Sequence, residues 1–94
     1  MRTSVNAGKR RVLFKLAAEA GSEVSVAGTF NNWDVASKPL KDRNGTGRYS
    51  TVVFLPPGRY EYKFLVNGKW CVDPECTDWV PNNHGSLNSV IVVK

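Results

Sequence analysis

Short segments in which apolar and polar side chains alternate, separated by residues that favour turns, recur along the whole chain. In residues 11–16, for example, every second side chain from Val12 to Leu16 is large and apolar. A period of two residues is typical of a β-strand that buries one face, whereas a helix repeats every ~3.6 residues. The pattern therefore predicts an all-β protein, and no segment convincingly indicates a helix.

Turn residues mark the ends of the predicted strands. Pro56-Pro57 stops one strand, because neither proline can donate a hydrogen bond to a neighbour, and Asn67-Gly68 predicts a tight hairpin. The predicted strands are residues 11–16, 23–28, 39–41, 49–55, 60–66, 69–72 and 87–93, with a long loop at 73–85. About seven short strands over about 90 residues indicate an antiparallel β-sandwich of immunoglobulin-like size.

The length of the chain limits it to one hydrophobic core. A chain of 94 residues has no room for a second core. We expect a flexible N-terminal segment at residues 1–9 and a single β-sandwich domain at residues 10–94. Its apolar runs are far shorter than the ~20 residues that span a bilayer, which argues against a membrane protein. The net charge of +5 leaves nucleic acid or an anionic surface open as a partner without requiring either.

The N-terminal residues and the cysteines bear on the compartment. Lys15 interrupts the apolar stretch after the basic start, and Glu19 occupies the would-be cleavage site, so the sequence argues against a signal peptide. We therefore expect a cytoplasmic protein. Cys71 and Cys76, with a single histidine, are too few for a zinc site unless carboxylates complete it. We expect both thiols to be free, because a reducing compartment disfavours a disulfide.

The patterns that would indicate catalysis are weak. No glycine-rich loop joins a strand to a helix, and His84 has no nucleophile motif beside it. Asp34, Asp73 and Asp78 could supply the carboxylate pair of a glycosidase, but we interpret them as solvated turn residues. We therefore expect no enzyme activity, no catalytic residue, no cofactor and no metal.

Two tryptophans occupy unusual positions. Trp33 follows Asn31-Asn32 in a turn, and Trp70 lies beside the tip of the predicted hairpin, whereas a sandwich normally buries its large rings in mid-strand. Each indole could fold back as a plug for its loop, or it could serve as a flat platform for a sugar ring or a nucleobase. Four other aromatic residues fall on inward strand faces and are assigned to the core: Phe14, Tyr60, Tyr62 and Phe64.

Several motifs occur in a fixed order over nearly the whole chain. They are VSVAGTFNNW at residues 24–33, PL at 39–40, GRYEYKF at 58–64, VNGKW at 66–70, DP at 73–74 and GSLNSV at 85–90. Together they resemble carbohydrate-binding module family 48. This family includes the glycogen-binding domain of the β subunit of AMP-activated protein kinase and the N-terminal modules of isoamylases and branching enzymes.

The resemblance implies an early-set immunoglobulin-like β-sandwich that binds α-1,4-linked glucans such as glycogen, starch or maltooligosaccharides without cleaving them. It also implies that Trp33 and Trp70 stack on successive glucose rings. Lys63, Ser86 and Asn88 would donate or accept hydrogen bonds with sugar hydroxyls, which suits their chemistry. The implied role is to target a larger protein to polysaccharide, with a kinase, phosphatase or glucan-processing enzyme fused to the module or associated with it.

The chain departs from the family pattern at two positions. His84 stands where kinase-subunit members have a leucine that enters the concave side of the glucan. The imidazole could stack and hydrogen-bond in its place, its presence could weaken binding, or it could simply be a solvated loop residue. Trp79 has no counterpart, and we interpret it as a plug at the end of the sandwich in preference to an extension of the platform.

Two alternatives remain open at this point. The same fold could be a structural or protein-interaction domain whose sugar site has decayed. The domain could also bind single-stranded nucleic acid through its exposed aromatic rings and its excess of basic residues. We favour this less, because Lys9, Arg10 and Arg11 cluster far in sequence from the tryptophans.

Overall fold

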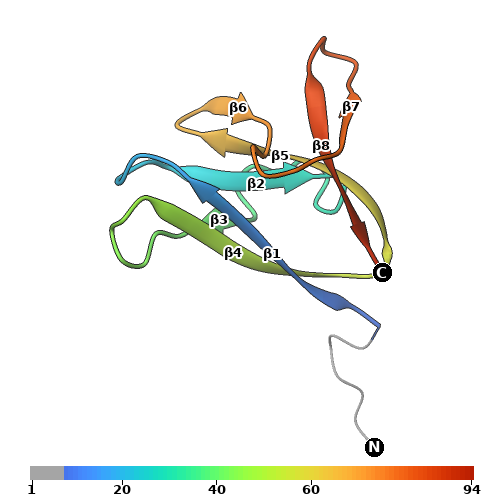
Figure 1. The fold of residues 1–94 in the computed structure, drawn as a ribbon, viewed down its shortest axis with the longest axis horizontal. Helices are drawn as coiled ribbons and strands as arrows, with labels where there is room; N and C mark the ends of the chain where they lie inside the picture. The colour runs from blue at the N-terminus through green and yellow to red at the C-terminus, as the bar shows by residue number, and fades with distance from the viewer. Residues whose placement is uncertain (1–7) are drawn as a thin grey trace, which may run out of the picture.

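All regular secondary structure in the computed structural model, which describes residues 8–94, consists of β-strands (Figure 1). The strands are β1 (Arg10–Ala17), β2 (Val24–Gly28), β3 (Pro39–Leu40), β4 (Arg48–Leu55), β5 (Gly58–Val66), β6 (Lys69–Cys71), β7 (Trp79–Pro81) and β8 (Leu87–Val93). Residues 1–7 of the predicted N-terminal segment lie outside the described residues. Over residues 8–94 there is no helix long and apolar enough to cross a membrane.

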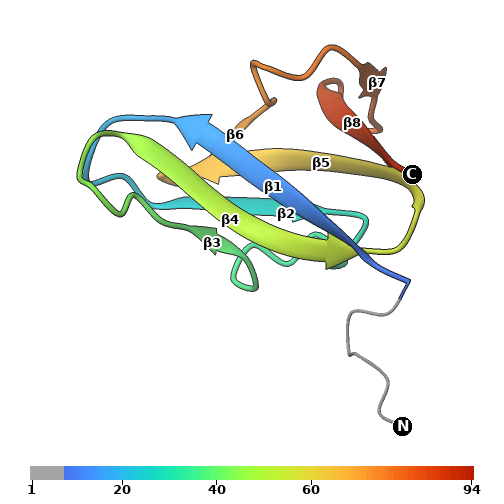
Figure 2. The same ribbon diagram turned by 60° about the horizontal axis from the view of Figure 1, so that its bottom comes forward.

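The strands form two antiparallel layers. β1 and β4 pair along their full length, from Arg10↔Leu55 to Ala17↔Arg48. The other six strands form a sheet in the order β3-β2-β5-β8-β7, with β6 pairing the free part of β5. Figure 2 shows β1 and β4 crossing in front of β2 and β5. The predicted all-β sandwich is confirmed, with eight strands where about seven were expected.

The core lies between these two layers. Phe14 of β1 packs edge-on against Tyr62 of β5, with ring centroids 4.9 Å apart, and Phe64 is fully buried. Tyr60 is partly buried against the same cluster. The core positions predicted for these four aromatic residues are therefore confirmed.

Two predictions about turns and loops have opposite outcomes. The Asn67-Gly68 hairpin is confirmed: both residues adopt left-handed backbone angles, with φ of 49° and 82°, as a two-residue type I′ turn requires. The prediction that residues 73–85 form one long loop is wrong, because Trp79–Pro81 pairs with β8 as the short strand β7.

The segment between β6 and β7 is anchored to the core by Tyr62. The hydroxyl of Tyr62 donates to Asp73 Oδ2 at 2.7 Å, and the backbone N–H of Asp73 donates to Ser89 Oγ at 2.9 Å. Burial, followed by the hydrogen bond to Asp73, raises the pKa of Tyr62. Cys71 and Cys76 are free thiols, as expected.

Asp42 holds the turn that leads into β4. Its Oδ2 accepts the N–H of Gly47 at 2.7 Å, and its Oδ1 accepts the N–H of Thr46 at 3.0 Å. These backbone donors, Gly47 foremost, lower the pKa of Asp42.

We expect Asp42→Asn to lower the melting temperature at neutral pH. A carboxyl whose pKa is depressed by folding stabilises the protein above its unfolded-state pKa of about 4, and this contribution is lost as the pH falls through the folded pKa. The difference between wild type and variant should therefore shrink on acidification. Thermal unfolding followed by circular dichroism across the acid range would test this, and a pH-independent difference would contradict it.

Candidate functional site

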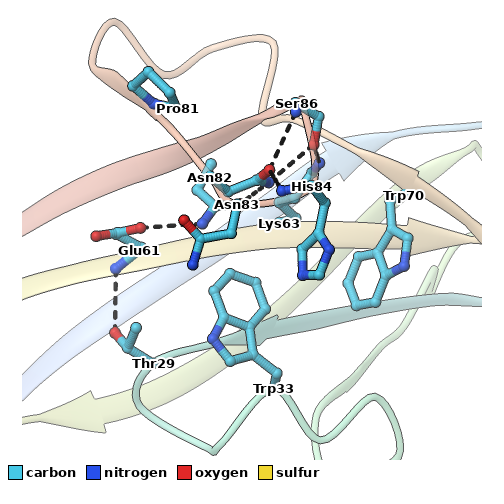
Figure 3. A pocket seen from close by; sticks show the side chains of 11 residues that line it. Thr29, Trp33, Glu61, Lys63, Trp70, Pro81, Asn82, Asn83, His84 and Ser86 are labelled. Carbon is cyan, nitrogen blue, oxygen red and sulfur yellow. Dashed lines mark hydrogen bonds between the residues drawn. The ribbon is translucent and has the colours of Figure 1, made fainter.

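An open cleft of about 690 Å³ lies over the face of β5 that points away from β1 and β4. Its volume is in the range of roughly 300–1,000 Å³ that is typical of small-ligand sites. The lining residues come from the turn after β2, from β5 and β6, and from the β7–β8 hairpin (Figure 3). They are Thr29, Trp33, Glu61, Lys63, Trp70, Pro81, Asn82, Asn83, His84, Ser86 and Asn88.

Trp33 is presented by a tight turn that Asn31 closes. The Oδ1 of Asn31 accepts the N–H of Gly28 at 3.0 Å, while its Nδ2 donates to Ser37 Oγ at 2.9 Å. The N–H of Trp33 donates to the carbonyl of Gly28 at 2.9 Å. Gly28 must lack a side chain, because a Cβ there would collide with the carbonyl oxygen of Glu61.

The backbone of this turn is strained at Trp33. Its φ is +59°, a left-handed angle that residues with a bulky side chain rarely adopt, and the preceding Asn32 has a φ of +56°. Strain of this kind persists only where the surrounding structure imposes it, and it clusters at functional sites.

The two indoles form an angled pair. Their ring centroids lie 6.4 Å apart and their planes meet at 76°. The side chain of Trp70 remains 48% exposed. The rings therefore do not make one flat surface, and they do not bury each other.

A chain of hydrogen bonds, from Lys63 through Ser86, Asn82 and Asn88 to Glu61, joins the β7–β8 hairpin to β5. The Nδ2 of Asn82 donates to Ser86 Oγ at 2.9 Å and to Asn88 Oδ1 at 3.0 Å. Asn88 in turn donates to Glu61 Oε1 at 3.0 Å, and Lys63 donates to Ser86 Oγ at 2.9 Å. The hairpin is thereby fixed over the strand that forms the floor of the cleft.

Asn82 itself has no hydrogen-bonding capacity left for a ligand. Its Oδ1 accepts the backbone N–H groups of His84 and Ser86 at 2.9 and 3.1 Å, and both of its amide hydrogens are used within the chain of hydrogen bonds. Asn82 is therefore a positioning residue for the two side chains that it holds, Ser86 and Asn88.

The structure brings together all six residues that the sequence analysis singled out for carbohydrate binding. Trp33, Lys63, Trp70, His84, Ser86 and Asn88 all line the cleft. The imidazole of His84 points from the hairpin loop toward the two indoles (Figure 3). Trp79 lies outside the cleft and is 43% exposed, so it neither extends the platform nor fills the sandwich as the expected plug would.

Sequence reasoning missed Glu61 and Asn82. Glu61 could have been identified from the sequence, because residues two apart on a strand share a face and Glu61 precedes Lys63 by two. Asn82 was harder to find: only its place after a proline and before Gly85 hinted at a turn-forming asparagine.

Fold and cleft together define a small β-sandwich with a ligand-sized cleft on the outer face of its larger sheet. The chain belongs to the family described as the glycogen recognition site of AMP-activated protein kinase, which matches residues 11–94. This match confirms the resemblance drawn from the sequence motifs.

Curated relatives point to the same family. Subunit β-2 of 5′-AMP-activated protein kinase from Mus musculus and from Homo sapiens is 36% identical over 77 residues, which cover 82% of this chain and 27% of the subunit. Subunit β-1 from Sus scrofa is 38% identical over 74 residues, which cover 79% of this chain and 57% of that sequence. The chain therefore spans about a quarter of the length of the β-2 subunits that it matches.

The strain at Trp33 predicts an inverted order of stability between two variants. Trp33→Gly and Trp33→Ala both remove the indole, but only alanine keeps a Cβ at the left-handed position. We expect the glycine variant to be more stable by about 1 kcal/mol, measured by urea unfolding. Trp70 lies in strand β6, where glycine is normally destabilising, so we expect Trp70→Ala to be more stable than Trp70→Gly. If Trp33→Ala proved at least as stable as Trp33→Gly, the assignment of a strained left-handed backbone at residue 33 would be wrong.

Proposed function

We propose that this chain binds α-1,4-linked glucan, as glycogen, starch or maltooligosaccharide, and does not cleave it. The observation that carries the proposal is the angled pair of Trp33 and Trp70 in the lining of a cleft that also presents polar side chains, in a chain of the glycogen recognition family. Rigid aromatic rings can pack against the apolar C–H faces of sugars with little loss of entropy.

The angle between the rings favours a curved ligand. Two flat sugars in line, as in cellulose, could not lie against two planes that meet at 76°. Successive glucose units of an α-1,4-glucan turn relative to one another, so neighbouring units can each face one indole. The geometry of the pair would thus select against flat β-linked chains.

The polar residues of the cleft complement a ligand rich in hydroxyl groups. Asn88 uses one amide hydrogen for Glu61 and one lone pair for Asn82, which leaves one donor and one acceptor for a sugar hydroxyl. Lys63 and Ser86 each keep donors, and His84 faces the indoles from the hairpin loop. Because the sugar is neutral, we expect weak affinity, set by stacking and a few hydrogen bonds.

The single carboxylate among the described lining residues supports binding without hydrolysis. Glycoside hydrolysis commonly uses two carboxyl groups that flank the scissile bond. Among the described lining residues only Glu61 carries a carboxylate, and it is engaged by Asn88 and by Arg59, whose guanidinium lies 3.2 Å from its Oε2.

We further propose that residues 10–94 act as one module that directs a larger protein or complex to polysaccharide in the cytoplasm. The relatives are named as kinase subunits, and this chain spans only part of their length. A kinase is therefore the first candidate partner, ahead of a phosphatase or a glucan-processing enzyme.

Replacing Trp70 by alanine should weaken binding of maltoheptaose about fivefold or more, because loss of one stacking ring removes about 1–3 kcal/mol, as for a base stacked on an aromatic side chain. Isothermal titration or affinity electrophoresis in a glycogen gel would measure this. Trp79→Ala is the matched control: Trp79 is similarly exposed but lies outside the cleft, so the control should bind as the wild type does.

Two results would overturn the proposal. One is no binding of maltoheptaose at millimolar concentration, which would favour a structural domain with a decayed site. The other is equal loss in the Trp70 and Trp79 variants, which would place the ligand elsewhere. Binding of a single-stranded oligonucleotide with steep salt dependence would favour the nucleic-acid alternative, since neutral sugar binding hardly responds to salt.

A further inference from the structure

Lys63 carries a positive charge that the described residues leave without a carboxylate. Its side chain is only 9% exposed, and its ammonium donates one hydrogen bond, to Ser86 Oγ at 2.9 Å. The one ion pair found within residues 8–94 joins Arg59 to Glu61 instead. Removing an ammonium from water is unfavourable, and a neutral hydroxyl offsets only part of that loss. A cation held in this way beside a cleft indicates a ligand that completes its bonding.

The direction of the hydrogen bonds around Lys63 is fixed by the backbone. The N–H groups of His84 and Ser86 can only donate, so the oxygen of Asn82 must face them and its amide hydrogens must face Ser86 and Asn88. The Oγ of Ser86 then accepts from both Lys63 and Asn82. Since a hydroxyl accepts at most two hydrogen bonds, what Ser86 has left for a ligand is its own O–H, a donor.

We propose that the Lys63–Ser86 end of the cleft is a subsite for a phosphate monoester carried on an α-glucan. The capacity left on these two residues consists of donors alone, together with one uncompensated positive charge. A sugar hydroxyl can accept from these donors, but it brings no negative charge to compensate the ammonium. A phosphate monoester presents acceptor oxygens and negative charge, which match both features.

The nearby negative charge of Glu61 does not oppose this assignment. Its Oε2 is paired with Arg59 at 3.2 Å, and its Oε1 accepts from Asn88, so the carboxylate is neutralised at the opposite end of the chain of hydrogen bonds from Lys63. The inference rests on the proposed function, because the indoles would hold the glucan whose phosphate reaches Lys63.

The test compares maltoheptaose with maltoheptaose carrying one phosphate monoester, by isothermal titration on the whole chain. We expect the phosphorylated maltoheptaose to bind to the protein on the order of tenfold more tightly, as for a charge-assisted hydrogen bond. This preference should shrink at high salt and be lost in Lys63→Met. Lys15→Met removes the same charge from an exposed position on β1, outside the cleft, and should keep the preference. Ser86→Ala, at an exposed loop position, provides a second variant if Lys63→Met does not fold.

The outcomes separate this inference from the proposed function. Equal affinity for the two glucans, or a preference that survives in both Lys63→Met and Ser86→Ala, overturns the phosphate subsite while glucan binding stands. If the phosphorylated maltoheptaose binds and the unmodified one does not, the phosphate subsite is supported and recognition of neutral glucan is overturned. If neither glucan binds, both fail. Inorganic phosphate and glucose 6-phosphate form the remaining arms: if either binds as tightly as the phosphorylated glucan, the assignment to a glucan-borne ester is wrong.

Discussion

The alternation of side chains along β5 is the constraint on which both the core and the cleft depend. β5 pairs with β2 along one edge and with β8 and β6 along the other, so its register is fixed from both sides. Tyr62 and Phe64 point into the sandwich, and Glu61 and Lys63, which alternate with them along the strand, point out. A slip of one residue would move the charges into the core and the rings to the surface. The packing that stabilises the sandwich therefore also sets the floor of the cleft.

The rest of the cleft is held against this floor by short connections. The Asn67 side chain that shapes the β5–β6 hairpin also accepts the N–H of Glu23 at 2.8 Å, which ties the hairpin carrying Trp70 to the segment before β2. The Asn31 turn fixes Trp33 at the other end of β2. Because these hydrogen bonds hold the turns that carry both rings, the backbone there has little conformational entropy left to lose when a ligand binds.

The longest strands could be predicted from sequence because each is long enough to show a period, and the short strand β6 because the Asn67-Gly68 turn precedes it. β1, β4 and β5 have eight or nine residues each, and their alternation is unmistakable. β7 has three residues, ends in a proline and exists only because β8 lies beside it, so no local signal could have revealed it. The same holds within the site. The six residues proposed to bind sugar followed from the family resemblance of the motifs. The 76° angle between Trp33 and Trp70 and the fully used hydrogen bonds of the Asn82 side chain arise instead from contacts that local sequence patterns do not show.

Two features of the cleft are unfavourable for folding, and they lie in the same place. A glycine at position 33 would relieve the left-handed backbone, and an apolar side chain at position 63 would avoid burying a cation. Elsewhere the chain follows the local rules closely: Gly68 occupies its left-handed turn position, and no side-chain nitrogen or oxygen buried within residues 8–94 lacks a hydrogen bond. Departures that fall together in an otherwise consistent structure are expected where the chain serves a ligand in addition to its own stability. The indole at 33 and the ammonium at 63 are what such a ligand would contact, one through its apolar face and the other through its charge.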